Sequence, residues 1–221
     1  MRAIFRFGKI GRLRFVSHLD LQRYMQRALN RTNLPAAYSL GFNPHPVMSF
    51  ASALAMGWQS EYEVLDIKLS ETMSAKEALK ELRSALPEEL PVYECRLVDD
   101  NHASMMSLVQ MSDYRITPDQ HFEALKAAAR EFLFSENVMA IRKTKSSERE
   151  INIRPLCVNL TCDETSFKAR LMLTEKDTLK PDLLMNTLMK MAGIEDSEFS
   201  IARERLLGYS KAGKLLPLME L

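Results

Sequence analysis

The chain has 221 residues, 46% of them hydrophobic and 27% charged, and a formal net charge of +1. This composition is typical of a globular protein that buries a sizeable core in one domain or two small ones, and it excludes a mainly disordered chain. No apolar run reaches the roughly 18 residues of a transmembrane helix, and the basic, interrupted start is unlike a secretory signal. We therefore expect a cytoplasmic protein.

The first half is expected to hold two helices among several strands. Ser17 fits the N-cap of the first helix, and Asp20 stands at its third position, where a carboxylate can reach back to the cap. Apolar residues then recur at helical spacing until the segment 30–35 ends the helix. A second helix is expected at 74–86. The expected strands are 2–8, 12–16, 36–40, 47–55, 61–69 and 91–98, the first two being a tight hairpin or one bulged strand.

The second half repeats this order. A helix is expected at 119–134, with Pro118 at its first turn, and another at 181–192. The expected strands are 107–117, 137–143, 150–162, 166–174 and 197–208. Two strand–helix–strand units side by side are the split βαβ pattern. The sequence therefore predicts an α+β protein of two tandem ferredoxin-like domains with antiparallel sheets, residues 1–100 and 107–221, divided near 99–106.

Charge is distributed unevenly along the chain. Residues 1–60 carry eight basic side chains and one acidic side chain, whereas residues 61–110 carry five basic and eleven acidic ones. A concentrated positive field attracts phosphate-rich or acidic partners. The alternative is that the acidic stretch packs against the basic one as an internal salt-bridge surface.

The start of the first helix holds the first candidate site. A helix N-terminus favours anions, arginines one turn apart can fork onto successive phosphates, and a histidine there can move a proton. The candidates are Arg14, Ser17, His18, Asp20, Arg23 and Arg27. Two alternatives stay open: His18 and Asp20 serve only to build the helix start beside solvated arginines, or His18 is an acid–base catalyst.

The loop SLGFNPHP, residues 39–46, is the second candidate site. Two prolines fix the backbone on either side of His45, and Gly41 permits a positive φ. Such a stiff, uncharged loop is suited to presenting Ser39, Phe42, Asn43 and His45 to a ligand. The same residues are also common in plain turns.

A third basic segment lies in the second half, in IRKTKSSEREINIRPL. It is either a strand–loop–strand that follows a phosphate backbone or a solvated hairpin. Its cations are Arg142, Lys143, Lys145, Arg149 and Arg154. Aromatic residues near the basic segments could stack on bases, although most of them are expected in the core.

Recognised catalytic and cofactor motifs are missing from the sequence. It has no phosphate-binding glycine loop, no GxGxxG, no GxSxG and no HExxH, and its three cysteines match no zinc or iron–sulfur spacing. We expect no cofactor and no metal. A metal held by His18, Asp20 and His45 is an open alternative.

The segments Lys9–Asp20 and Ser39–Pro46, followed by Gly57, Ser60 and Glu63, resemble a known family, the radical-SAM-linked domain of unknown function. EINIRPL (150–156) and IARERLL (201–207) are similar to its second-half motifs, with Asn152 where the family more often has Asp. The resemblance implies a separate radical SAM protein as partner and a role beside RNA. The expected fold is also similar to that of the CRISPR-associated repeat-RNA endonucleases, an analogy of fold alone.

We therefore expect an RNA- or polyanion-binding accessory protein that acts with a radical SAM enzyme in RNA modification or processing. One alternative is a metal-independent RNA endonuclease or RNA-modifying enzyme that uses His18 or His45. Another is a protein-interaction module that docks on the radical SAM partner through residues 61–110. The oligomeric state stays open.

Overall fold

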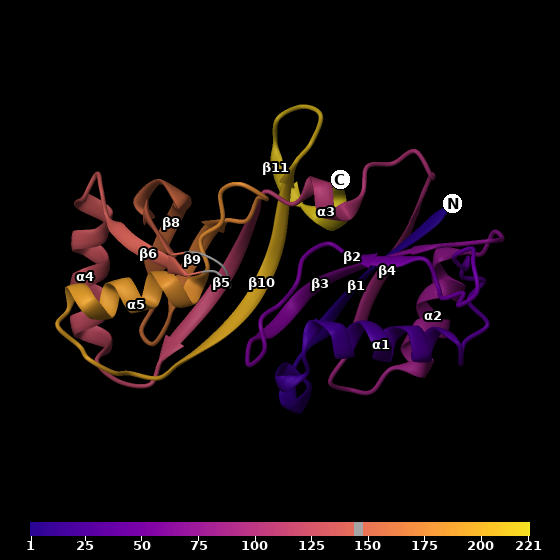
Figure 1. Cartoon of the computed structure of the whole chain (residues 1–221), viewed down its shortest axis with the longest axis horizontal. Helices are drawn as coiled ribbons and strands as arrows, with labels where there is room; N and C mark the ends of the chain where they lie inside the picture. Colours follow the sequence, from indigo (N-terminus) through magenta and orange to yellow (C-terminus); the bar gives the residue numbers. More distant parts are fainter. Residues whose placement is uncertain (144–147) are drawn as a thin grey trace. The chain divides into compact units, whose positions relative to one another are not determined.

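The computed structural model describes residues 1–143 and 148–221 (Figure 1). It is a mixed α+β protein with a large, mostly antiparallel sheet. The chain forms two compact units, residues 1–109 with 205–221 and residues 110–204. No helix of the described residues is long and apolar enough to cross a membrane.

The first unit is built on β1 (Arg2–Lys9), β2 (Met48–Phe50), β3 (Gln59–Lys68) and β4 (Val92–Val98). Strand β1 lies between β4 and β3 and is antiparallel to both, and β2 is antiparallel to β3. The register of β1 on β3 shifts between Phe7 and Lys9. Strand β1 ends at Lys9, and residues 12–16 form neither a hairpin nor a bulged strand with it, so both alternatives for the start of the chain were wrong.

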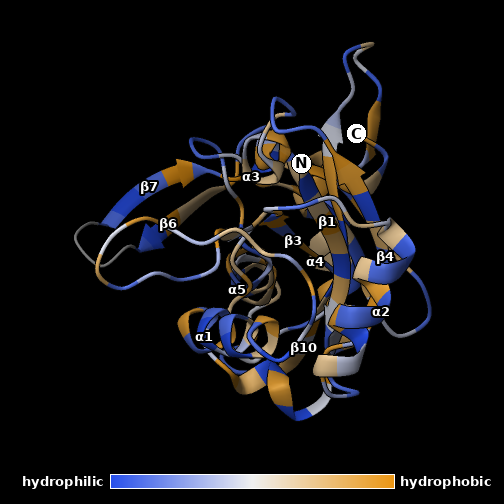
Figure 2. Ribbon diagram, turned by 90° about the vertical axis from the view of Figure 1, so that its right-hand side faces the viewer, coloured by the Kyte–Doolittle hydropathy of each residue, from blue (hydrophilic) through white to orange (hydrophobic). Residues whose placement is uncertain are grey.

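Two helices also contribute residues to the hydrophobic core of this unit. They are α1 (His18–Leu29) and α2 (Ala75–Ala85), each carrying hydrophilic and hydrophobic residues along its length (Figure 2). Alternate residues of β1 pack with the apolar face of α1, because side chains on one face of a strand recur at every second residue. The packed residues of these two elements are Ala3, Phe5, Phe7, Leu21, Met25 and Leu29.

Three segments of the first half were wrongly predicted as strands or predicted too long. Residues 12–16 lie mostly in a 3-10 helix, η1 (Gly11–Phe15), and only 48–50 of the expected strand 47–55 is a strand. Residues 36–40 form only isolated bridges, Ala36 with Leu69 and Tyr38 with Pro46. Gly11 has a φ of 58°, which turns the chain out of an extended path and into η1.

The second unit has the strands β5 (Met111–Pro118), β8 (Cys157–Cys162), β9 (Phe167–Met172) and residues 199–204 of β10 (Phe199–Tyr209). Their order is β10-β5-β9-β8, and the β5–β9 and β9–β8 pairs are antiparallel. The helices α4 (Phe122–Phe134) and α5 (Pro181–Met191) contribute buried residues to this unit's core. A separate hairpin pairs β6 (Met139–Lys143) with β7 (Glu148–Asn152).

Two expectations for the second half needed correction. The expected strand 150–162 is broken at Arg154–Leu156, a 3-10 helix (η2), because Pro155 has no N–H to donate to a ladder. The helix expected from residue 119 starts at Phe122, since Pro118 still belongs to β5 and His121 has a left-handed φ of 59°. A short helix, α3 (Met105–Leu108), precedes β5.

Residues 205–221 belong to the first unit, whereas the sequence placed them with the second. Strand β11 (Leu215–Pro217) pairs with β10, and the 3-10 helix η3 (Leu218–Glu220) follows it. Leu218 is fully buried, and the Met219 N–H donates to the Tyr62 hydroxyl at 3.1 Å. Strand order alone could not reveal that this tail packs against the strand that carries Tyr62.

Candidate functional site

Ser17 and Asp20 build the start of α1 as the sequence predicted. The Ser17 hydroxyl oxygen accepts from the Asp20 N–H at 3.2 Å and donates to the Asp20 carboxylate at 2.7 Å. This hydrogen bond from Ser17, with the nearby Arg23, holds the pKa of Asp20 below its usual range. Both residues are therefore engaged in capping the helix.

His18 is the first residue of α1 and is half-buried. Its ring meets Phe50 of β2 edge to face, with ring centroids 5.1 Å apart. Burial lowers the pKa of His18, while the charge of Glu63 raises it and that of Lys9 lowers it. The imidazole is thus held mainly neutral near pH 7, in the form that can accept a proton.

Three buried polar residues, Lys9, Ser60 and Glu63, lie on β1 and β3, and the charges of Lys9 and Glu63 act on His18. The exposed fractions of these side chains are 0%, 0% and 2%. Lys9 and Ser60 are opposite each other on β1 and β3, and the Lys9 ammonium donates to the Val16 carbonyl at 2.7 Å. Burial lowers the pKa of Lys9 and the charge of Glu63 opposes that shift. Charged groups are rarely buried so fully unless they are paired, and here Lys9 has both the Val16 carbonyl and the charge of Glu63.

The sequence analysis missed these three residues as site residues. Lys9 was counted only with the basic field, and Ser60 and Glu63 were noted only within a motif. The usable signal was the family-like motif, which contains Lys9, His18, Ser60 and Glu63 although they lie far apart in the chain. Lys9 also continues the inward-facing series of Phe5 and Phe7 on β1.

The basic residues of 1–60 divide into two groups. Arg2 pairs with Asp66 at 2.8 Å, Arg6 pairs with Glu94, and the charge of Glu63 acts on Lys9. These three agree with the alternative in which the acidic stretch packs against the basic one. Arg31 donates to the Ala85 carbonyl at 3.1 Å and ties α1 to α2.

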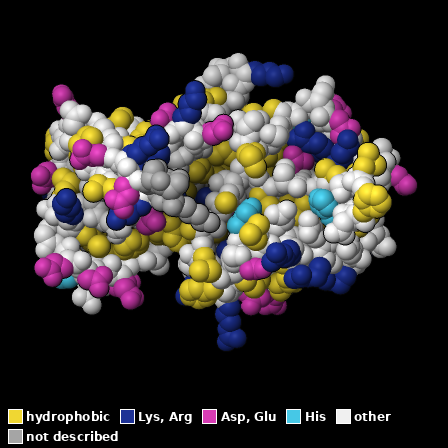
Figure 3. Space-filling view, in the orientation of Figure 1, with side chains coloured by type: hydrophobic (Ala, Val, Ile, Leu, Met, Phe, Trp, Pro, Cys, Tyr) yellow, Lys and Arg dark blue, Asp and Glu magenta, His cyan; other side chains and the backbone are white. Residues whose placement is uncertain are grey.

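The remaining arginines lie on η1 and α1. Arg23 and Arg27 are exposed, and the Arg23 guanidinium contacts Asp20 at 3.2 Å with both side chains largely in solvent. The Arg14 guanidinium lies 4.7 Å from the centre of the exposed Phe15 ring. Lys and Arg side chains gather over α1 in the space-filling view (Figure 3). This arginine face, Arg12, Arg14, Arg23 and Arg27, is accessible to a partner.

The 39–46 loop is held by its own hydrogen bonds. The Ser39 hydroxyl lies 3.1 Å from His45 Nδ1 and also accepts from the His45 N–H, and Ser39 N–H donates to the His45 carbonyl. Phe42 is fully exposed, and Asn43 is exposed beside it. Within the described residues no contact joins His45 to His18, so the loop and the helix start are separate features.

The second-half cations are mostly engaged within their own unit. Arg154 donates to the carbonyls of Cys157 and Leu133, and Lys143 pairs with Glu148 at 2.9 Å. Arg142 donates to the Thr178 carbonyl. Lys145 lies outside the described residues.

The described residues contain no group of three or more His, Cys, Asp or Glu side chains that could hold a metal ion. His18, Asp20 and His45 therefore do not come together as a ligand set. Cys95 and Cys157 are free thiols, and burial raises the pKa of each to about 12, which keeps them unreactive.

Comparison with known proteins gives one family. A family model described as an uncharacterized protein conserved in bacteria (DUF2344) matches residues 2–181. A search of the curated proteins gives no significant match.

Proposed function

The chain belongs to this bacterial family of uncharacterized proteins, and from its own residues we propose that it binds RNA or a similar polyanion through the arginine face. The observation that carries the proposal is the division of the basic residues. Arg2, Arg6 and Lys9 are matched by acidic residues of the sheet, whereas Arg23 and Arg27 are exposed on α1, where the ion pair of Arg23 with Asp20 lies largely in solvent. Exposed guanidinium groups one turn apart suit the spacing and chemistry of phosphates.

Exposed aromatic side chains support a single-stranded partner. Phe15 stands beside Arg14 at the start of the arginine face, and Phe42 is presented by the self-supported loop. Bases of unpaired RNA stack on such rings, and this contact tolerates many sequences.

The wider setting of this function is proposed from the sequence resemblance. We propose that the protein is an accessory of a separate radical SAM enzyme, acts in the cytoplasm, and belongs to RNA modification or processing. We also propose that its two units are variants of the ferredoxin-like fold. The strand orders β4-β1-β3-β2 and β10-β5-β9-β8 support this, since the short β2 lies at the same place as β8.

The first test compares two pairs of cations on the two helices of one unit. Binding of a fluorescent single-stranded RNA is measured by anisotropy for the wild type, for Arg23→Ala/Arg27→Ala, and for the control Lys76→Ala/Lys80→Ala on α2. We expect the Arg23→Ala/Arg27→Ala substitutions to weaken RNA binding about tenfold or more, and the Lys76→Ala/Lys80→Ala substitutions to have a small effect. Equal losses would mean that binding depends only on net charge and would contradict a specific face.

A second candidate function is acid–base chemistry on RNA, and the buried cluster beside His18 favours it. A mainly neutral imidazole next to buried Lys9 and Glu63 resembles the tuned groups of active sites. Turnover of RNA by the purified protein, lost in His18→Ala and kept in His45→Ala, would support this candidate. Intact binding without turnover would reject it.

The interaction-module alternative predicts a different outcome. Capture of the radical SAM partner without RNA, unaffected by Arg23→Ala/Arg27→Ala, together with no RNA binding by the wild type, would favour docking over the RNA proposal.

A further inference from the structure

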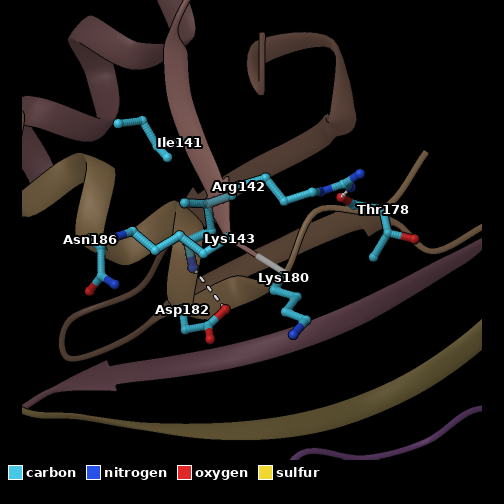
Figure 4. Close-up of a pocket in the computed structure, with 8 residues that line it drawn as sticks. Ile141, Arg142, Lys143, Thr178, Lys180, Asp182 and Asn186 are labelled. Carbon is cyan, nitrogen blue, oxygen red and sulfur yellow. Dashed lines mark hydrogen bonds between the residues drawn. The ribbon is translucent and has the colours of Figure 1, made fainter. Parts of the chain in front are cut away.

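The second unit contains a cavity of about 640 Å³ between the β6–β7 hairpin and the start of α5 (Figure 4). Strand β6 supplies Ile141 and Arg142, and the first two turns of α5 supply Asp182, Leu183 and Asn186. This volume lies in the range of small-molecule sites, roughly 300–1,000 Å³. The arginine face and the buried cluster of the first unit contribute nothing to it.

Positive charge predominates on the wall of this cavity. It is lined by Arg142, Lys143 and Lys180 and by the carboxylate of Asp182, and the Lys143 ammonium is already paired with Glu148 at 2.9 Å, which leaves Arg142 and Lys180 as the cations for a ligand. Arg142 is held in place by its hydrogen bond to the Thr178 carbonyl, and Lys143 extends across the cavity toward Asn186 (Figure 4). Lys180 is exposed and occupies the N-cap of α5. The cations thus approach the cavity from both the hairpin and the helix.

The helix start adds to this field. Helix α5 has eleven residues, no side-chain hydrogen bond from its N-cap residue, and a positive end that lies at the cavity beside the exposed Lys180. The Asp182 carboxylate accepts from the Leu183 N–H at 2.8 Å and occupies one N–H of the helix start, so Lys180 and Arg142 have to outweigh its negative charge.

The rest of the wall fits a flat, partly apolar group. Ile141 is more than half exposed, and Leu183 is half-buried on the opposite side of the cavity. The Asn186 amide offers both a donor and an acceptor, which is the pair needed to bind the edge of a base.

We propose that this cavity binds a nucleotide, with the phosphate at Lys180 and Arg142 and the base against Ile141 and Leu183. The nucleotide is either free or one unit of an RNA strand, and both share this chemistry. With a free nucleotide the inference stands apart from the RNA proposal above, whereas with RNA it rests on that proposal and adds a second contact point.

The test uses the full chain and calorimetric titration with UMP, AMP, inorganic phosphate and a six-residue oligouridylate. Lys180→Ala and Asn186→Ala change the cavity, and Lys190→Ala is the matched control, an exposed lysine at the other end of the same helix. We expect nucleotide binding that Lys180→Ala weakens about tenfold and that Lys190→Ala leaves unchanged. Asn186→Ala should weaken the binding of UMP and AMP and leave the binding of inorganic phosphate unchanged.

Several results would overturn the inference: no nucleotide binding by the wild type, equal losses in Lys180→Ala and Lys190→Ala, or inorganic phosphate binding as tightly as UMP. Tighter binding of the oligouridylate than of UMP would identify RNA as the ligand of the cavity. Tighter binding of UMP would identify a free nucleotide. Arg23→Ala/Arg27→Ala should leave UMP binding unchanged, so failure of the RNA proposal can be told apart from failure of this one.

Discussion

At the scale of single residues, Lys9 and Glu63 distinguish the start of α1 from an ordinary capped helix. Capping requires only Ser17 and Asp20, which already satisfy each other. Removing two charged groups from water costs several kcal/mol per ion unless their partners compensate for it. The charges of this cluster act in opposite directions on the half-buried His18, whose pKa is lowered mainly by its own burial.

This arrangement predicts how His18 titrates. We expect its pKa below the ordinary 6.5, because burial disfavours the imidazolium and outweighs the attraction of Glu63. Glu63→Gln should lower the pKa of His18 further, and Lys9→Met should raise it, as followed by NMR of the ring protons. A His18 pKa at or above 6.5 in the folded wild type would contradict the arrangement.

The same shift makes stability depend on pH. Because the pKa of His18 is lower in the folded state than in the unfolded state, the unfolded chain takes up this proton first as the pH falls. The His18 contribution to the free energy of unfolding is thus complete above about pH 6.5 and declines toward the lowered pKa. The difference in free energy of unfolding between the wild type and His18→Gln, measured with urea, should be constant above this window and should change within it.

At the scale of elements, helices were predicted better than strands. Helix α1 was recognised from its Ser17 cap and its apolar spacing, both of which are local properties of the sequence. The 12–16 and 36–40 segments look strand-like but have no partner strand along their length, and pairing depends on residues distant in sequence. The break before β8 was readable in principle, since Pro155 argues against a continuous strand.

Strand β10 yields a test of how the C-terminal residues pack. A Cβ placed on Gly208 would lie 2.2 Å from the Leu108 carbonyl oxygen, so only glycine fits there without a backbone shift. We expect Gly208→Ala to lower the free energy of unfolding by about 1–3 kcal/mol, as overpacking does, measured by urea unfolding. The exposed Lys211→Ala serves as the control. Unchanged stability in Gly208→Ala would argue against the packing of residues 205–221 in the first unit.

At the scale of the whole molecule, the charge pattern was compatible with an exposed basic surface or with internal salt bridges. Each of these describes some of the basic residues. The excess of basic residues in 1–60 is partly used internally, by Arg2 and Arg6, and partly displayed, by Arg23 and Arg27. A count of charges could not separate the two groups, because pairing across strands depends on register. The sequence placed the candidate site at the start of α1, and the buried residues beside it became visible only once β1 and β3 were side by side.

The most direct test of the central proposal is the salt dependence of RNA binding, wild type beside Arg23→Ala/Arg27→Ala. Each phosphate contact contributes about 0.7 to the slope of log K against log salt for a single strand. We therefore predict affinity that falls steeply with salt in the wild type, and a slope shallower by about 1.4 in the double variant. No binding at low salt, or the same slope in both proteins, would contradict phosphate contacts on the arginine face.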